Sequence, residues 1–188
     1  APLFNGKDLT GWKVNENPKS VRVEKGALVV QGERAHVFYD GPVYHHDFKN
    51  FELRALVMTR KNANSGIYFH TKFQKDGWPA RGYEVQVNNS QGDWRRTGGL
   101  YAVDDVKEAP AQDDKWFLME VRVVGKHVTV KVDGKVTVDY TEPDGVKRDQ
   151  GFEGRLIDRG TFALQCHDPG SEVHYKDIAV RPLPEAAK

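Results

Sequence analysis

Short runs of alternating apolar and polar residues fill most of the chain, and no stretch carries the apolar spacing of an amphipathic helix. Turn-forming Gly, Pro, Asn and Asp residues separate the runs at near-regular intervals. Asp133-Gly134 lies between two alternating runs and predicts a hairpin turn, and Lys25-Gly26 predicts another. We therefore expect an all-β domain, a sandwich or barrel of short antiparallel strands. The predicted strands lie within residues 20–32, 50–60, 65–73, 82–88, 98–103, 115–140, 160–167 and 171–183.

Two stretches interrupt the strand pattern, residues 72–82 and residues 103–115. Long loops in compact domains often line a binding site, although a solvated connector is an equal alternative for 103–115. The first loop carries an aromatic residue, Trp78, which we take as a candidate ligand contact. With 188 residues, the chain is long enough for one domain with a sizeable core, predicted to span residues 1–188.

The segment "GYEVQVN" at 82–88 shows how polar side chains would gather on one sheet face. Strand side chains alternate, so Glu84 and Gln86 lie on the face opposite Tyr83, Val85 and Val87. If the neighbouring strands belong to the same sheet, the same alternation adds Tyr68, His70, Tyr101, Gln165 and His167 to this polar face. A sheet face that is merely solvated is the alternative. The lack of lysine and the abundance of His, Gln and Tyr favour a ligand-binding face.

These residue types fit carbohydrate chemistry. Amides and carboxylates bind sugar hydroxyl groups, and aromatic rings stack on sugar C–H surfaces. His and Glu can also move protons once their pKa values are tuned. The same groups are ordinary metal ligands, so a divalent metal ion held by Glu84 and His167 is an open alternative, with no other cofactor indicated. Glu52 is a weaker candidate for a second carboxylate.

Composition restricts the function classes. Charged residues make up 29% and hydrophobic residues 38% of the chain, which is typical of a globular domain. The formal net charge of +1 gives no sign of a nucleic-acid or membrane partner, and no apolar run approaches the ~20 residues that span a bilayer. The single cysteine, Cys166, excludes an internal disulfide. The sequence contains no phosphate-binding glycine loop, G-x-S-x-G elbow or H-E-x-x-H motif.

Several longer motifs resemble one known family. "LFNGKDLTGW", "NSGIYFH", "GYEVQV", "TGGLY" and "GTFALQCHDPGS" follow one another in the order found in the 3-keto-disaccharide hydrolase domain family, and with "HYKDIAVRPL" the resemblance runs from residue 3 to residue 183. It implies a jelly-roll β-sandwich of two antiparallel sheets, of the concanavalin A-like lectin and glucanase type. Members are commonly exported by bacteria, so a periplasmic or secreted location is expected.

The resemblance also implies an activity. Characterised relatives cleave or hydrate glycosides whose C3 hydroxyl is oxidised to a ketone, and a divalent metal is implicated for some. We accordingly expect an oligosaccharide or glycoside substrate. The expected catalytic residues are Glu84, His167 and His70, and the expected substrate contacts are Gln86, Gln165, Tyr101, Tyr68 and Trp78. Many members have Arg where this chain has His70. The alternative is a non-catalytic carbohydrate-binding module, since a fold alone does not establish catalysis.

Overall fold

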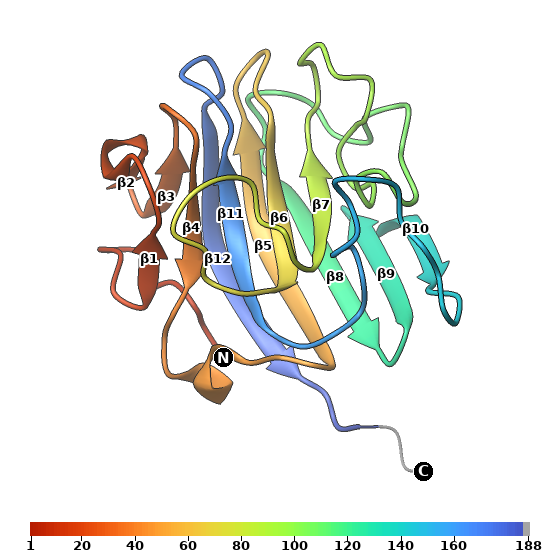
Figure 1. Cartoon of the computed structure of the whole chain (residues 1–188). Helices are drawn as coiled ribbons and strands as arrows, with labels where there is room; N and C mark the ends of the chain where they lie inside the picture. Colours follow the sequence, from red (N-terminus) through yellow and green to blue (C-terminus); the bar gives the residue numbers. More distant parts are fainter. Residues whose placement is uncertain (186–188) are drawn as a thin grey trace.

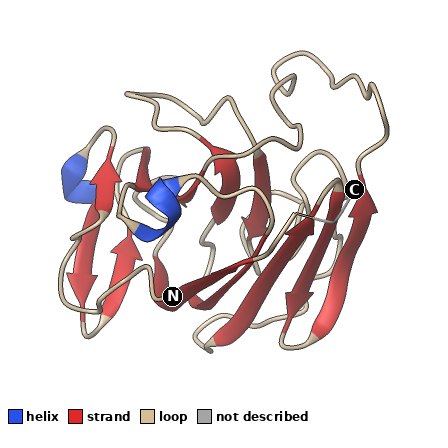
Figure 2. Ribbon diagram, turned by 90° about the horizontal axis from the view of Figure 1, so that it is seen from below, coloured by secondary structure: helices blue, strands red, loops and turns tan. Residues whose placement is uncertain are grey.

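The computed structural model describes residues 1–185 and consists of two stacked antiparallel β-sheets (Figure 1). Viewed from below, the strands form two layers, and two short 3₁₀ turns are the helical elements of the described residues (Figure 2). The five-stranded sheet has the order β1 (Trp12–Val14), β4 (Ala35–Tyr39), β11 (Thr161–Cys166), β6 (Ser65–Thr71) and β7 (Tyr83–Val87).

The second sheet has seven strands in the order β10 (Lys135–Thr141), β9 (His127–Val132), β8 (Phe117–Val124), β5 (Phe51–Thr59), β12 (Val173–Pro182), β3 (Ala27–Val30) and β2 (Val21–Glu24). The 3₁₀ turns are η1 (Pro18–Ser20) and η2 (Val43–His46). The all-β prediction and the jelly-roll sandwich of two antiparallel sheets are confirmed. No helix within residues 1–185 is long and apolar enough to cross a membrane. The predicted domain extends to residue 188, and residues 186–188 lie outside the described residues.

The strand predictions differ from the structure in three places. Residues 98–103 form a turn instead of a strand: Leu100 bridges Val85 and Asp104, and Ala102 has a left-handed φ of 60°. Strand β4 was missed, along with the short β1. All five residues of β4 are buried, so its sequence "AHVFY" lacks the polar alternation of a half-exposed strand.

The main core lies between the two sheets, where the apolar faces meet. Tyr83, Val85 and Val87 of β7 are fully buried there, as alternation predicts. At one end, the Phe162 ring lies 4.7 Å from the Phe48 ring and 4.9 Å from the Phe51 ring, measured between centroids. This aromatic cluster ties β11 of one sheet to β5 of the other.

The five-stranded sheet is unusual because its outer face is covered too. Every residue of β6, β7 and β11 is buried, including the polar ones. In Figure 1 the loop between β6 and β7 and the connection between β10 and β11 cross in front of this sheet. Polar side chains on that face are therefore enclosed between strands and loops, which is the setting of a pocket.

We expect Phe162→Ala to lower the free energy of unfolding by about 3–5 kcal/mol, because it leaves a cavity inside the aromatic cluster. Urea unfolding followed by fluorescence measures the change. Val136→Ala, at a 49% exposed position, is the control and should change stability by no more than about 0.5 kcal/mol. Equal losses in the two variants would contradict this account of the core.

Candidate functional site

A pocket of ≈ 400 Å³ lies on the outer face of the five-stranded sheet. Its volume falls in the range of ordinary small-molecule sites. Three strands provide its floor, and the loops 72–82, 88–102 and 142–160 provide its walls. It is lined by Asn64, Tyr68, Trp78, Pro79, Ala80, Glu84, Asp93, Tyr101, Gly151, Phe152, Arg155, Gln165 and His167.

Glu84 is the buried carboxylate of this pocket, with 4% of its surface exposed. Arg155, 8% exposed, approaches it with Nη2 3.3 Å from Glu84 Oε2. Burial raises the pKa of Glu84, and the Arg155 charge together with hydrogen bonds from Tyr68, Arg155 and Gln165 offsets part of this rise. The Arg155 guanidinium also lies 5.5 Å from the centre of the Tyr68 ring and 5.8 Å from that of Tyr101, within cation–π range.

Gln165 connects the carboxylate to the neighbouring phenol. Its Nε2 donates to Glu84 Oε1 at 3.1 Å and to Tyr68 Oη at 3.1 Å. Within residues 1–185, the buried atoms Gln165 Oε1 and Arg155 Nη1 have no hydrogen-bond partner. Since buried polar atoms are nearly always paired, one free acceptor and one free donor in the same pocket fit a polar ligand.

Gly66 explains why the carboxylate can lie so close to the sheet. A Cβ atom on Gly66 would lie 2.4 Å from Glu84 Oε1 and 2.8 Å from Glu84 Cγ. Only a residue without a side chain leaves this space free. The glycine of the "NSGI" motif is therefore a packing requirement of Glu84.

His167 forms a dyad with Asp168 at the pocket edge. The ring Nδ1 donates to Asp168 Oδ2 at 2.7 Å, which leaves Nε2 as the atom able to accept a proton. Ser171 Oγ donates to the same carboxylate oxygen at 2.8 Å, and Gly170 N donates to Oδ1 at 2.8 Å. Burial raises the pKa of Asp168, but these hydrogen bonds outweigh it and lower the pKa overall. The aspartate is thus held as an anion that orients the imidazole.

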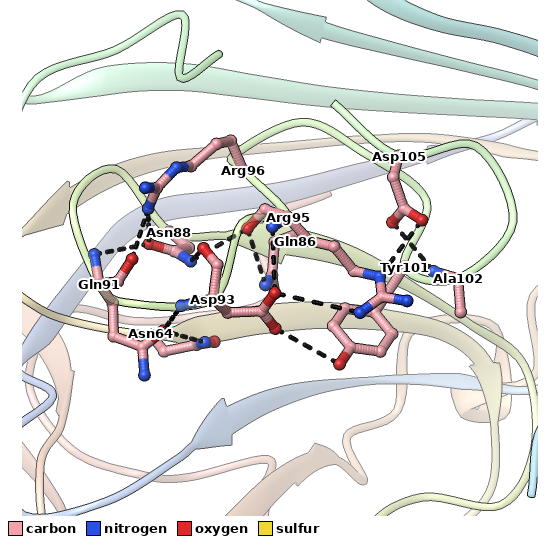
Figure 3. A network of polar contacts seen from close by, with 10 residues as sticks. All are labelled: Asn64, Gln86, Asn88, Gln91, Asp93, Arg95, Arg96, Tyr101, Ala102 and Asp105. Carbon is pink, nitrogen blue, oxygen red and sulfur yellow. Dashed lines mark hydrogen bonds and ion pairs between the residues drawn. The ribbon is translucent and has the colours of Figure 1, made fainter. Parts of the chain in front are cut away.

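A polar network in residues 88–105 forms the opposite wall (Figure 3). Tyr101 Oη donates to Asp93 Oδ2 at 3.4 Å, and Arg95 Nε donates to Asp105 Oδ2 at 3.2 Å. The Arg95 guanidinium lies 4.7 Å from the centre of the Tyr101 ring. Gln86 lies beneath this loop and donates to the Arg95 carbonyl at 3.3 Å. It shares the sheet face with Glu84, as predicted, but the loop separates it from the pocket.

His36 lies beside the pocket, behind Trp78. Its ring makes edge contacts with Trp78 at 5.6 Å and with Tyr68 at 5.4 Å between centroids. Neither ring nitrogen has a partner within residues 1–185, and the residue is fully buried. Burial lowers the pKa of His36 to about 3, so the imidazole is neutral at physiological pH.

The structure brings together six of the predicted site residues, Glu84, Tyr68, Trp78, Tyr101, Gln165 and His167. His70 is not among them, and its predicted place on the polar face is wrong. Its ring packs on Phe51 and Phe69, and its Nε2 donates to the Lys49 carbonyl at 2.8 Å. The cause is a β-bulge: β6 has one extra residue opposite β11, and His70 adopts a left-handed φ of 56°, so the alternation reverses.

Sequence reasoning missed Arg155, Phe152 and Asp93, which all line the pocket. Arg155 and Phe152 lie in residues 142–160, where no strand pattern ties them to a face. The loop prediction was correct for 72–82, whereas no residue of 103–115 lines the pocket. The oppositely charged residues Asp93 and Arg95, on either side of Trp94 in the loop that follows the Glu84 strand, were the one local signal available.

Glu52 is not in this pocket. It lies on the outer face of the seven-stranded sheet, in a groove of ≈ 610 Å³. There it accepts hydrogen bonds from Arg122 at 3.2 Å and from Arg181 at 2.9 Å. Although this groove is larger, these paired charges are typical of a solvated sheet face and offer no acid–base chemistry.

The residues of the pocket do not fit a metal site. No group of three His, Cys, Asp or Glu side chains within residues 1–185 is arranged to hold a metal ion. The Glu84 carboxylate is already bonded to Arg155 and Gln165, and the adjacent guanidinium would repel a divalent cation. The described residues therefore give no support to a metal held by Glu84 and His167.

The fold and the pocket define a lectin-like β-sandwich with a polar, aromatic pocket between the outer face of one sheet and the loops that cover it. The sequence model of one protein family, the 3-keto-alpha-glucoside-1,2-lyase-like domain, matches residues 1–181. The chain belongs to this family. A curated relative from Bacteroides thetaiotaomicron, named 3-keto-disaccharide hydrolase, is 31% identical over 86 residues. That match covers 40% of this chain and 30% of the relative's length.

Solved structures show the same fold. A Parabacteroides distasonis protein provisionally classed as a glycosyl hydrolase aligns with a TM-score of 0.81 at 22% identity, covering 97% of this chain and 93% of that one. A Bacillus subtilis carbohydrate-binding module, CBM66, aligns with a TM-score of 0.67 at 10% identity, covering 95% and 99%. At these identities the likeness supports the β-sandwich alone.

We expect Gly66→Ala to displace the Glu84 carboxylate and to lower the free energy of unfolding by about 1–3 kcal/mol through overpacking. Thermal and urea unfolding measure the loss. Gly92→Ala is the matched control, because a Cβ there meets nothing within 4 Å. A stable Gly66→Ala protein with Glu84 unmoved in a crystal structure would contradict the packing requirement.

We expect His36 to make the protein less stable in acid. The unfolded chain takes up a proton on this imidazole below pH ~6.5, whereas the folded protein does so only below about pH 3. The free energy of unfolding should therefore fall with decreasing pH between these values, at about 1.4 kcal/mol per pH unit from this group. Urea unfolding from pH 7 to pH 4 should show a shallower slope for His36→Phe. His45→Phe, at an exposed position, keeps the His36 contribution and is the control.

Proposed function

We propose that this pocket cleaves glycosides whose C3 hydroxyl has been oxidised to a ketone, by elimination followed by addition of water. The observation that supports the proposal is a pocket lined by a buried Glu84–Arg155 pair and, at its edge, by His167, whose imidazole is paired with Asp168. Membership of the 3-keto-alpha-glucoside-1,2-lyase-like family makes this substrate class the first to test. With it we propose the periplasmic or secreted location of exported relatives.

The chemistry starts from the acidity that the ketone confers on the C2 hydrogen. His167 Nε2 takes this proton, and the C–H electron pair forms an enolate with its charge on the C3 oxygen. Arg155 stabilises this charge, because a preorganised cation in a buried site acts where charge develops. The donor proposed for this oxygen is Arg155 Nη1, which has no partner within residues 1–185.

The enolate then reforms the ketone and expels the C1 substituent, leaving a C1=C2 double bond. The departing oxygen takes its proton from the protonated form of Glu84, which burial favours because it raises the pKa of this carboxyl group. Addition of water, OH to C1 and H to C2, completes a net hydrolysis. Gln165 and Tyr101 hold sugar hydroxyl groups, and Trp78 stacks on a sugar ring.

This route differs from that of ordinary glycosidases, which place two carboxyl groups on either side of the scissile bond. Here one carboxylate is paired with an arginine and the base is an imidazole, a combination suited to proton abstraction beside a carbonyl. Asp93, the other carboxylate of the pocket, accepts a hydrogen bond from Tyr101 and is given no proton-transfer role.

The test is incubation of the purified protein with a 3-keto-glucoside, with and without chelator, following aglycone release by chromatography. Exchange of the C2 hydrogen for deuterium in D₂O measures proton abstraction separately from bond cleavage. Glu84→Gln and His167→Ala should each lower kcat about 10²–10⁴-fold, as expected for loss of an acid or base. Glu52→Gln, on the other sheet, should retain full activity.

An inert wild-type protein, with and without added divalent metals, would overturn the proposal. In that case calorimetry with unoxidised oligosaccharides decides the alternative. Binding without turnover would establish a carbohydrate-binding module.

A further inference from the structure

The segment that carries Arg155 is fastened to the sandwich by a second arginine. Arg148 Nε donates to the backbone carbonyl of Arg155 at 2.8 Å. Its Nη2 donates to Tyr83 Oη at 2.8 Å and to Tyr140 Oη at 2.7 Å. One guanidinium thus joins the pocket wall to strands of both sheets, β7 and β10.

Glu142 completes this fastening at the start of the same segment. Tyr83 Oη donates to Glu142 Oε2, and the backbone N–H of Ile157 donates to the same oxygen at 2.7 Å. The Tyr83 hydroxyl group accepts from Arg148 and donates to Glu142, so it links the two residues. Residues 142–157 therefore form a closed loop whose two ends meet at the Glu142 carboxylate, which also accepts from Tyr83.

The position of Tyr83 links this fastening to the site. Tyr83 and Glu84 are consecutive in β7, so their side chains point to opposite faces. Tyr83 holds the loop through Arg148, and Glu84 meets the arginine that the loop delivers, at 3.3 Å. A shift of the loop 142–157 along β7 would therefore move Arg155 away from Glu84.

We propose that Arg148 is a positioning residue, which holds the Arg155 guanidinium against Glu84 through the Arg155 carbonyl and the hydroxyl groups of Tyr83 and Tyr140. This inference rests on the proposed function, in which Arg155 stabilises the enolate. Arg148 itself does not line the pocket. A lysine at this position could not replace it, because a single ammonium group lacks the rigid fork that reaches three acceptors.

The loop also has a contact on its other side, which could place Arg155 without Arg148. Gly82 N donates to the Gly154 carbonyl at 3.0 Å, and a Cβ on Gly154 would lie 1.7 Å from the Ala80 carbonyl oxygen. The test must therefore separate the contribution of Arg148 from that of the Gly154 contact.

The test compares Arg148→Met, Arg148→Lys and Tyr140→Phe with the matched control Lys147→Met, which removes the same charge from an exposed neighbour. The first readout is the side-chain Nε–Hε signal of Arg155 in a ¹⁵N–¹H correlation spectrum, assigned by its loss in Arg155→Lys. We expect this signal to broaden or move toward that of free arginine in Arg148→Met. It should be unchanged in Lys147→Met.

The second readout is the kinetics on a 3-keto-glucoside. Arg148→Met should lower kcat about 10²-fold, the cost of a misplaced catalytic group, with little change in KM. Arg148→Lys should recover little of this loss, and Lys147→Met should behave as wild type. Tyr140→Phe removes one of the three acceptors, so it should show a smaller change in the same direction.

Thermal unfolding separates positioning from general damage. A folded Arg148→Met protein with the Arg155 signal and kcat unchanged would overturn the inference. If Arg148→Met does not fold, Tyr140→Phe tests the inference instead. An unchanged Arg155 signal in Tyr140→Phe would overturn the positioning role of Arg148. An inert wild type would remove the proposed function, but the Arg155 signal would still report whether Arg148 fixes this side chain.

Discussion

A carboxylate removed from water needs a cation and hydrogen-bond donors, and this requirement governs the site around Glu84. Arg155 supplies the charge, while Gln165 and Tyr68 supply hydrogen bonds. Gly66 leaves the space, because any Cβ there would meet the carboxylate. The pair therefore requires β6, β7 and β11 to be correctly aligned. It also requires the loop 142–160 to place Arg155 beside Glu84. Much of the architecture near the pocket serves this one ion pair.

The sandwich meets the requirement by using both faces of its smaller sheet. One face packs against the seven-stranded sheet and forms the main core. The other face is roofed by loops, so its polar groups are enclosed although they lie outside the core. Two consecutive residues of β7 show the two faces of the sheet, since Tyr83 faces the core and Glu84 faces the pocket. An exposed sheet face would leave the same carboxylate solvated and ordinary in its acidity.

The β-sandwich is shared with the carbohydrate-binding module CBM66, so the fold alone does not distinguish catalysis from binding. The composition of the pocket carries that distinction. A dyad with one free imidazole nitrogen and a carboxyl group whose pKa is raised by burial are unnecessary for binding hydroxyl groups. They are the groups that proton transfer needs. The buried atoms Arg155 Nη1 and Gln165 Oε1 have no hydrogen-bond partner within residues 1–185.

The sequence by itself determined the all-β sandwich, most strand positions and the face shared by Glu84, Tyr68 and Gln165, because these follow from a two-residue period that is local to each strand. It failed at His70, where a bulge with a left-handed backbone reverses the period, and at β4, where burial on both sides erases it. Only the tertiary structure decided that Arg155 meets Glu84 and that Gln86 lies beneath a loop. Loops have no period to read, and their course depends on long-range contacts such as those of Arg148 with Tyr83 and Tyr140.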